Sequence, residues 1–240
     1  MMNDRKNELG QPIGFTVPDW KPCSLPPRAP MQGRYVRLEP ISVEGHAQDL
    51  FEAFAADRED RIWTYLPYGP FASVDDCRNW IEQSCLGDDP LFHAILDGDT
   101  GRAVGVASYL RIERGVGVIE VGHINYSPAL QKTRGATEAM YLMMRRVFGE
   151  LGYRRYEWKC DALNAGSCAA AGRLGFTYEG QFRQATMYKG RNRDTNWYSI
   201  LDTEWPALQR AYEAWLDPSN FDETGVQKHG LASLIKAGRA

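Results

Sequence analysis

VGVIEVGHINYSPALQKTRGATEAMYLMMRRVFGELG, residues 116–152, predicts a strand, a polar turn and an amphipathic helix in succession. β-branched and apolar residues dominate 116–126, as they do in strands, and Pro128 ends the segment because proline cannot extend a hydrogen-bonded ladder. An apolar stripe with members three or four residues apart then indicates a helix. The stripe consists of Ala136, Met140, Met143, Val147 and Leu151. Gly152 follows at a position typical of the end of a helix.

The turn between these two elements has the features of an anion site. The first amides of a helix have no partner within the helix, and the helix dipole favours negative charge there. Lys132 and Arg134 add two cations beside those amides. The pattern therefore indicates a phosphorylated ligand. Many strand–turn–helix units bind no ligand, and this alternative stays open.

The same stretch resembles the acetyl-CoA-binding core of the GNAT acyltransferase superfamily, which carries Gln/Arg-x-x-Gly-x-Gly/Ala at this turn. Gln131, Gly135 and Ala136 lie in that window, and the ATEA segment at 136–139 is similar to the branch of ribosomal-protein N-terminal acetyltransferases. Arg134 replaces the central glycine of the family pattern, so a pyrophosphate approaches less closely while a cation is gained. We interpret the loop as altered rather than lost.

A second segment strengthens the resemblance. Asn164 at a strand end, Ser167 soon after it and the closing Leu-Gly-Phe at 174–176 are similar to the second core motif of the superfamily. The resemblance covers residues 34–203 and implies the GNAT fold, an acetyl-CoA cosubstrate, an amine acceptor and direct transfer in a ternary complex. It implies coenzyme contacts by the backbone of Ile124 and Tyr126, by Asn164, and by the loop residues Gln131, Lys132, Thr133, Arg134, Gly135, Ala136 and Thr137.

The order of the predicted elements indicates an α+β protein with a mixed, mostly antiparallel central sheet flanked by helices. Strands are predicted at 34–39, 91–96, 103–112, 116–126, 153–161, 176–188 and 193–201, and helices at 42–57, 73–86, 136–151, 168–174 and 202–215. The chain divides into an extended Pro-rich arm (1–33), the acyltransferase domain (34–203) and a C-terminal helix with a polar tail (204–240). Phe15 and Trp20 are suited to anchor the arm on the domain or on a second subunit, which is compatible with a homodimer.

Composition excludes several classes of function. The 240 residues are 43% apolar and 25% charged, with a net charge of −3, so no basic field indicates nucleic acid. No run of about 18 apolar residues predicts a membrane span, and the N-terminus lacks the apolar core of a signal peptide. Five irregularly spaced cysteines without a C-x-x-C pair favour a reducing cytoplasm over a disulfide or zinc framework. Four scattered histidines indicate no metal site.

Acyl transfer to an amine requires a base and a group that protonates or stabilises the departing thiolate. Glu120 is the first candidate base, because a carboxylate in an apolar strand can take this role when it is buried beside a cofactor. His123 competes, although simple alternation places it on the opposite face of the strand unless a bulge at Gly122 changes the parity. An ion-paired carboxylate and a core histidine are the structural alternatives. The resemblance to ribosomal-protein acetyltransferases, in which a hydroxyl after the motif asparagine acts as the acid near the sulfur, implies this role for Ser167. The alternative is that Ser167 is the N-cap of the following helix.

The region between the first two predicted strands holds the acceptor in the GNAT pattern. Trp63, Tyr65, Tyr68 and Phe71 are therefore candidates for lining an amine pocket, and a packed core cluster is the alternative. Two other functions stay open: a non-catalytic acyl-CoA-binding sensor or scaffold, and a GNAT enzyme that transfers a larger acyl group such as succinyl.

Overall fold

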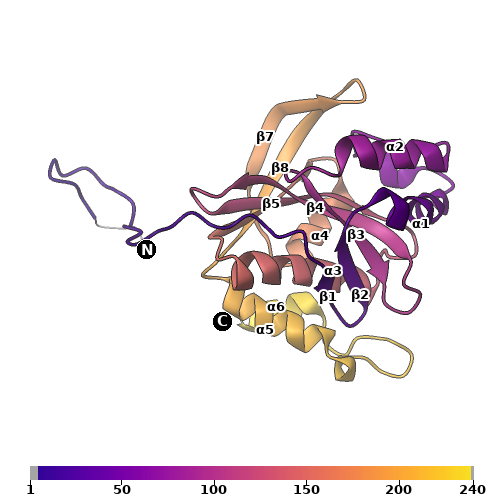
Figure 1. The fold of residues 1–240 in the computed structure, drawn as a ribbon. Coiled ribbons are helices and arrows are strands. Elements are labelled where there is room, and N and C mark those ends of the chain that lie inside the picture. The colour runs from indigo at the N-terminus through magenta and orange to yellow at the C-terminus, as the bar shows by residue number, and fades with distance from the viewer. Residues whose placement is uncertain (1–4, 239–240) are drawn as a thin grey trace.

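The computed structural model describes residues 5–238, and within this range eight strands form one sheet (Figure 1). The outermost residues of the predicted arm and tail, 1–4 and 239–240, lie outside the described range. The strands are β1 (Met31–Gln32), β2 (Val36–Pro40), β3 (Leu91–Asp97), β4 (Ala103–Glu113), β5 (Val118–Tyr126), β6 (Arg155–Asp161), β7 (Thr177–Tyr188) and β8 (Arg191–Leu201). Their order is β1-β2-β3-β4-β5-β6-β8-β7, and only β5 and β6 pair in parallel.

Helices cover both faces of the sheet, which confirms the predicted α+β class. They are α1 (Val43–Ala55), η1 (Arg61–Trp63), α2 (Val74–Ser84), α3 (Arg134–Arg145), η2 (Arg146–Glu150), α4 (Ala165–Arg173), α5 (Trp205–Leu216), η3 (Pro218–Asn220) and α6 (Leu231–Gly238). One hydrophobic core lies between the sheet and α3 to α6, and a second lies under α1 and α2. The β7–β8 hairpin projects beyond both cores (Figure 1).

Local sequence explains most of these elements. In β3 successive side chains enter different cores: Leu91 and Ile95 contribute to the first, whereas Phe92 and Ala94 contribute to the second. The strand is therefore apolar on both faces, and its sequence LFHAIL does not alternate with polar residues. Ser73 and Asp76 form a capping box at the start of α2.

The C-terminal segment is more ordered than its sequence indicates. Residues 218–240 were predicted to form a polar tail, but the described part contains η3 and α6. Leu231 and Ile235 of α6 are buried in the first core. The prediction was wrong because it treated residues 218–240 as uniformly polar and overlooked the apolar positions 231, 234 and 235, whose spacing is that of one helix face.

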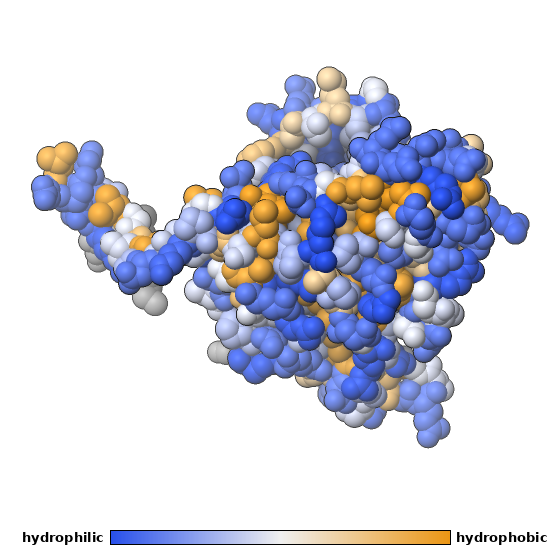
Figure 2. Space-filling model, in the orientation of Figure 1, coloured by the Kyte–Doolittle hydropathy of each residue, from blue (hydrophilic) through white to orange (hydrophobic). Residues whose placement is uncertain are grey.

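The predicted arm consists of two parts. Its second part follows the domain: β1 pairs with β2, and the buried Arg146 guanidinium donates to the carbonyls of Ala29 and Pro30 at 2.7 and 2.9 Å. The first part, residues 5–14, extends away from the body and carries exposed apolar side chains (Figures 1 and 2). The arm reaches the domain at Phe15, whose ring centroid lies 5.9 Å from the guanidinium carbon of Arg154, and at Trp20, whose indole donates to the carbonyl of Gly115 at 2.7 Å. Between residues 5 and 238, no helix is both long enough and apolar enough to cross a membrane.

Candidate active site

Strands β5 and β6 lie side by side only over part of their length. Their parallel pairing runs from Val118 and Arg155 to Val121 and Trp158. β5 then continues to Tyr126, while β6 stays paired with β8 up to its end. The backbone of residues 122–126 therefore faces an opening on its β6 side, where its N–H and C=O groups are available to an extended ligand. This is the geometry that the predicted role of Ile124 and Tyr126 requires.

The turn after β5 brings the start of α3 to the same opening. Thr133 is the N-cap, and its hydroxyl accepts from the amide of Ala136 at 3.1 Å. Gln131 donates its side-chain amide to the carbonyl of Tyr126 at 2.9 Å and so fixes the turn on the strand end. Lys132 is exposed and takes a left-handed backbone conformation, with φ of 60°. The amides of Arg134 and Gly135 precede the first hydrogen bond of the helix and can bind an anion.

Three of the predicted coenzyme contacts have packing roles in this structure. The Arg134 guanidinium lies 4.0 Å from the centre of the Phe221 ring, so it points to the C-terminal segment. Gly135 packs on β2, where a Cβ would lie 2.7 Å from Cγ1 of Val36. Thr137 is buried and accepts from the Arg173 guanidinium at 2.6 Å. Anion binding by the Arg134 guanidinium at the turn therefore requires a different rotamer of this side chain.

The second motif opens α4 beside β6. Asn164 is the N-cap, and its side chain accepts from the amide of Ser167 at 3.0 Å. The interpretation of Ser167 as the N-cap is wrong, because α4 begins at Ala165 and Ser167 is its third residue. The Ser167 hydroxyl instead accepts from the indole of Trp158 at 3.0 Å. Trp158 is the last β6 residue paired with β5, so Ser167 lies at the beginning of the opening.

A bulge in β5 brings the two candidate bases to one face of the sheet. Ser108 pairs with Gly122 and Val106 with Asn125, so one residue of β4 opposes two of β5. His123 occupies the bulge with φ of 50°. The alternation that placed His123 opposite to Glu120 is therefore wrong, and the bulge considered at Gly122 is present.

Glu120 is the centre of a network of ion pairs. Its carboxylate is almost fully buried and lies 2.7 Å from a guanidinium nitrogen of Arg111 and 2.8 Å from Nζ of Lys159. The pairs continue across four strands in the order Arg111, Glu120, Lys159, Glu157, Arg155 and Glu179. Both oxygens of Glu120 are thus engaged by cations, which agrees with the structural alternative for this residue.

His123 has a different environment. Its ring stacks on Tyr68 with 5.7 Å between centroids and lies 4.9 Å from the ring of Phe92. Burial, followed by the positive charges of Arg111 and Arg193, lowers the pKa of His123 to about 4. The imidazole is therefore neutral at physiological pH and can accept a proton.

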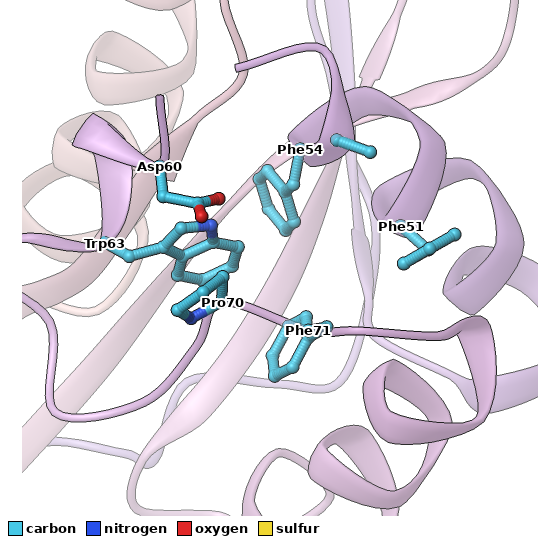
Figure 3. A pocket seen from close by; sticks show the side chains of 7 residues that line it. Phe51, Phe54, Asp60, Trp63, Pro70 and Phe71 are labelled. Atoms are coloured by element: carbon cyan, nitrogen blue, oxygen red, sulfur yellow. The ribbon is translucent and has the colours of Figure 1, made fainter. Parts of the chain in front are cut away.

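The four aromatic candidates divide between core and site. Trp63 is buried, and its ring packs edge-on against Phe54 and Phe71 at 5.1 and 5.0 Å. The adjoining hollow in Figure 3 holds about 20 Å³, room for roughly one water molecule, so it does not accept an amine substrate. Trp63 and Phe71 therefore belong to packing. Tyr68 reaches the candidate base, as described above, and its buried hydroxyl has no hydrogen-bond partner among the described residues.

Two connections close the acceptor side. The Tyr65 hydroxyl donates to the carbonyl of Leu163 at 3.0 Å, just before α4. From the β7–β8 turn, Lys189 donates to the carbonyl of Trp63 at 3.0 Å and Arg191 to that of Thr64 at 2.7 Å. The basic turn KGRN was predicted only as a hairpin connection, and nothing local in the sequence indicates that it binds the loop after α1.

The fold and this opening define an acyltransferase of the GNAT class, and the comparisons agree. The model of the acetyltransferase (GNAT) domain matches residues 36–177, so the chain belongs to the GNAT family. A GCN5-related N-acetyltransferase from Brucella melitensis is 44% identical with a TM-score of 0.90, over 92% of this chain and 100% of that one. A protein from Chromobacterium violaceum assigned to the GNAT family is 42% identical with a TM-score of 0.76, over 82% and 98%.

A more distant structure bears on the predicted branch. A Vibrio cholerae protein assigned as a ribosomal-protein-serine acetyltransferase is 17% identical with a TM-score of 0.62, over 78% of this chain and 99% of that one. At this identity the likeness concerns the fold. No curated protein matches the chain.

Proposed function

We propose that the protein transfers an acetyl group from acetyl-CoA to a primary amine by direct attack in a ternary complex, in the cytoplasm. The observation that carries the proposal is the end of parallel pairing at Val121 and Trp158, which leaves an open backbone edge beside the N-terminus of α3. Residues for a coenzyme, a proton acceptor and a proton donor surround this one opening.

The residues at the opening fit acetyl-CoA. The side chains of Asn125 and Ser127, at the end of β5, have buried polar atoms without a hydrogen-bond partner among the described residues. Buried polar groups of this kind are usually satisfied, so they suit the polar groups of a bound ligand. The backbone of Ile124 and Tyr126 would hold the amide-bearing arm, and the amides of Arg134 and Gly135 with Lys132 would hold phosphate. When bound, acetyl-CoA supplies an activated thioester.

His123 is the better candidate for the base. Its imidazole is neutral at physiological pH, whereas both Glu120 oxygens are held by cations. An imidazole with this low pKa is unprotonated at physiological pH and can accept a proton, but it is a weak base. The Ser167 hydroxyl accepts from Trp158 and interacts with the Cys160 thiol, and it can redirect its hydrogen to the departing sulfur. Glu120 would then act on the reaction only by orienting Lys159 and Arg111.

Thermal unfolding with acetyl-CoA and with plain CoA tests the cofactor first. A ligand that binds only the folded state raises the midpoint, and we expect both coenzymes to do so. Release of free thiol is then measured with a panel of primary amines. If neither coenzyme shifts the midpoint of a folded, CoA-free sample, the proposal fails.

Matched variants test the roles of individual residues. His123→Gln should lower kcat by about 10- to 100-fold, near the lower end of the range for a general base, with coenzyme affinity unchanged. His229→Gln is the control, because His229 is exposed and distant in sequence from the motifs. If Glu120→Gln abolishes turnover while His123→Gln does not, Glu120 is the base. A sensor would bind acetyl-CoA and show no turnover in any variant.

A further inference from the structure

Arg193, a charged side chain near the proposed acceptor side, forms no ion pair with a carboxylate of residues 5–238. Arg193 lies on β8, two residues before Thr195 in the chain. Thr195 pairs with Asp161, the last residue of β6, so Arg193 lies past the end of β6. Its Nε is buried and has no hydrogen-bond partner within residues 5–238. Its guanidinium carbon lies 5.9 Å from the centroid of the Tyr188 ring. A guanidinium is always charged, so this half-buried cation is left unneutralised.

The other charged groups at this end of the sheet are already engaged. The Asp161 carboxylate accepts from the Tyr188 hydroxyl at 2.7 Å and from the Leu163 amide at 2.8 Å. Lys189 and Arg191 are bound to backbone carbonyls, as described above. Arg193 is therefore free to bind a group that comes from outside the chain.

The position of Arg193 connects it to the transfer centre. Tyr188, which its guanidinium contacts, is bonded to the end of β6, on the far side of the opening from β5. The charge of Arg193 also acts on His123, across that opening. On β8, alternation places Arg193 on the same face as Trp197, whose ring lies 3.8 Å from the Lys159 ammonium. This is the face that carries Glu120 and the ion-pair network.

We propose that Arg193 binds a carboxylate of the substrate, through the planar two-nitrogen geometry that guanidinium offers to carboxylates. The carboxylate has two chemical sources: an acceptor such as an amino acid, or a dicarboxylic acyl group such as succinyl. The proposal rests on the proposed acyl transfer and names the class of substrate that the same site takes. It also gives a reason why a cation lies half-buried beside a histidine.

Paired substrates distinguish the two sources. Phenylalanine and phenylalaninamide, each with acetyl-CoA, differ by a carboxylate on the acceptor. Acetyl-CoA and succinyl-CoA, each with phenylalaninamide, differ by a carboxylate on the acyl group. We expect the carboxylate-bearing member of one pair to be preferred, and Arg193→Gln to lower kcat/KM for that member by about 10- to 100-fold. The uncharged combination should change by less than about threefold, and Arg193→Lys should restore part of the loss.

Arg183→Gln is the control, since Arg183 is exposed on the same hairpin. If Arg193→Gln lowers charged and uncharged combinations equally, Arg193 is structural and the proposal is overturned. A parent protein without preference for either carboxylate overturns it as well.

A binding measurement separates this proposal from the proposed function. Unfolding midpoints are recorded with N-acetylphenylalanine, N-acetylphenylalaninamide, acetyl-CoA and succinyl-CoA. A larger shift for a carboxylate-bearing ligand that disappears in Arg193→Gln supports the carboxylate site even when no turnover is found. Equal shifts within each pair, or no shift at all, overturn it.

Discussion

Glu138 offers the sharpest test of how the motif region supports the fold. Its carboxylate accepts from three successive backbone amides that lead into β2, those of Arg34, Tyr35 and Val36, at 2.8, 2.6 and 2.9 Å. Glu138 is itself buried on α3, although it belongs to the ATEA segment that resembles a coenzyme motif. The geometry therefore indicates that this glutamate attaches the first long strand to the central helix.

The loss on removing the carboxylate can be bounded. A hydrogen bond to a charged group contributes about 1.5–3 kcal/mol, and an unsatisfied buried amide adds a similar penalty. Water can replace the partner at the exposed Arg34 and the half-buried Tyr35 but not at the buried Val36. We therefore expect Glu138→Ala to lower the free energy of unfolding by about 3–5 kcal/mol. Glu138→Gln keeps one acceptor oxygen and should lower the free energy of unfolding by about 1–3 kcal/mol.

Urea denaturation followed by tryptophan fluorescence measures these differences, and the thermal midpoint should fall by roughly 10 °C for Glu138→Ala. Glu82→Ala, an exposed position on α2, is the control and should stay within about 0.5 kcal/mol of the parent. A Glu138→Ala protein less than about 1 kcal/mol below the parent would refute the assignment, as would a glutamine variant less stable than the alanine variant.

Three further perturbations test other parts of the structure. Burial lowers the pKa of His93 to about 3, so between pH 6.5 and 3 the unfolded chain binds a proton that the folded chain does not, and the free energy of unfolding falls as the pH falls. In urea titrations, His93→Met should remove about 1 kcal/mol per pH unit from the slope of the unfolding free energy against pH. Gly135→Ala should lower the free energy of unfolding by about 1–3 kcal/mol, because the new Cβ would contact Val36. Gly172→Ala, at a position of α4 with open space around it, should raise that free energy by up to about 1 kcal/mol in the same titration. Deleting residues 1–12 should leave the melting midpoint of the domain within about 2 °C, since the described part of that segment extends away from the body. A larger fall would show that the segment supports the fold.

Periodic, local patterns predicted most of the fold. The stripe in residues 136–151 predicted α3, and two apolar runs on either side of the turn residues at 97–101 predicted strands β3 and β4. Ser42 and Ser73 marked the starts of α1 and α2 because a helix N-cap depends on residues close in sequence. The family resemblance then identified the strand–turn–helix unit that borders the opening.

Features that depend on partners distant in sequence were not predicted. Gly122 indicated that a bulge beside His123 was possible, but its presence depends on the register of β5 against β4, which the residues of β5 alone do not specify. The burial of α6 depends on its packing against α5. The unpaired Nε of Arg193 depends on where the carboxylates around it are bonded. Such arrangements follow from tertiary packing, so a sequence gives the residue type but not its partner.

The ion-pair network explains how the opening between β5 and β6 can persist in a stable sheet. Backbone pairing between these strands stops at Val121 and Trp158, and Lys159 is the next residue of β6. Its ammonium bonds back to Glu120 on β5 and to Glu157 on its own strand, so side chains connect the two strands just where the backbone no longer does. The buried carboxylate of Glu120 therefore connects the strands through side chains at the end of their paired segment. Under the proposed acyl transfer, this engagement of Glu120 is the reason to expect that His123, three residues further along the same strand, accepts the proton.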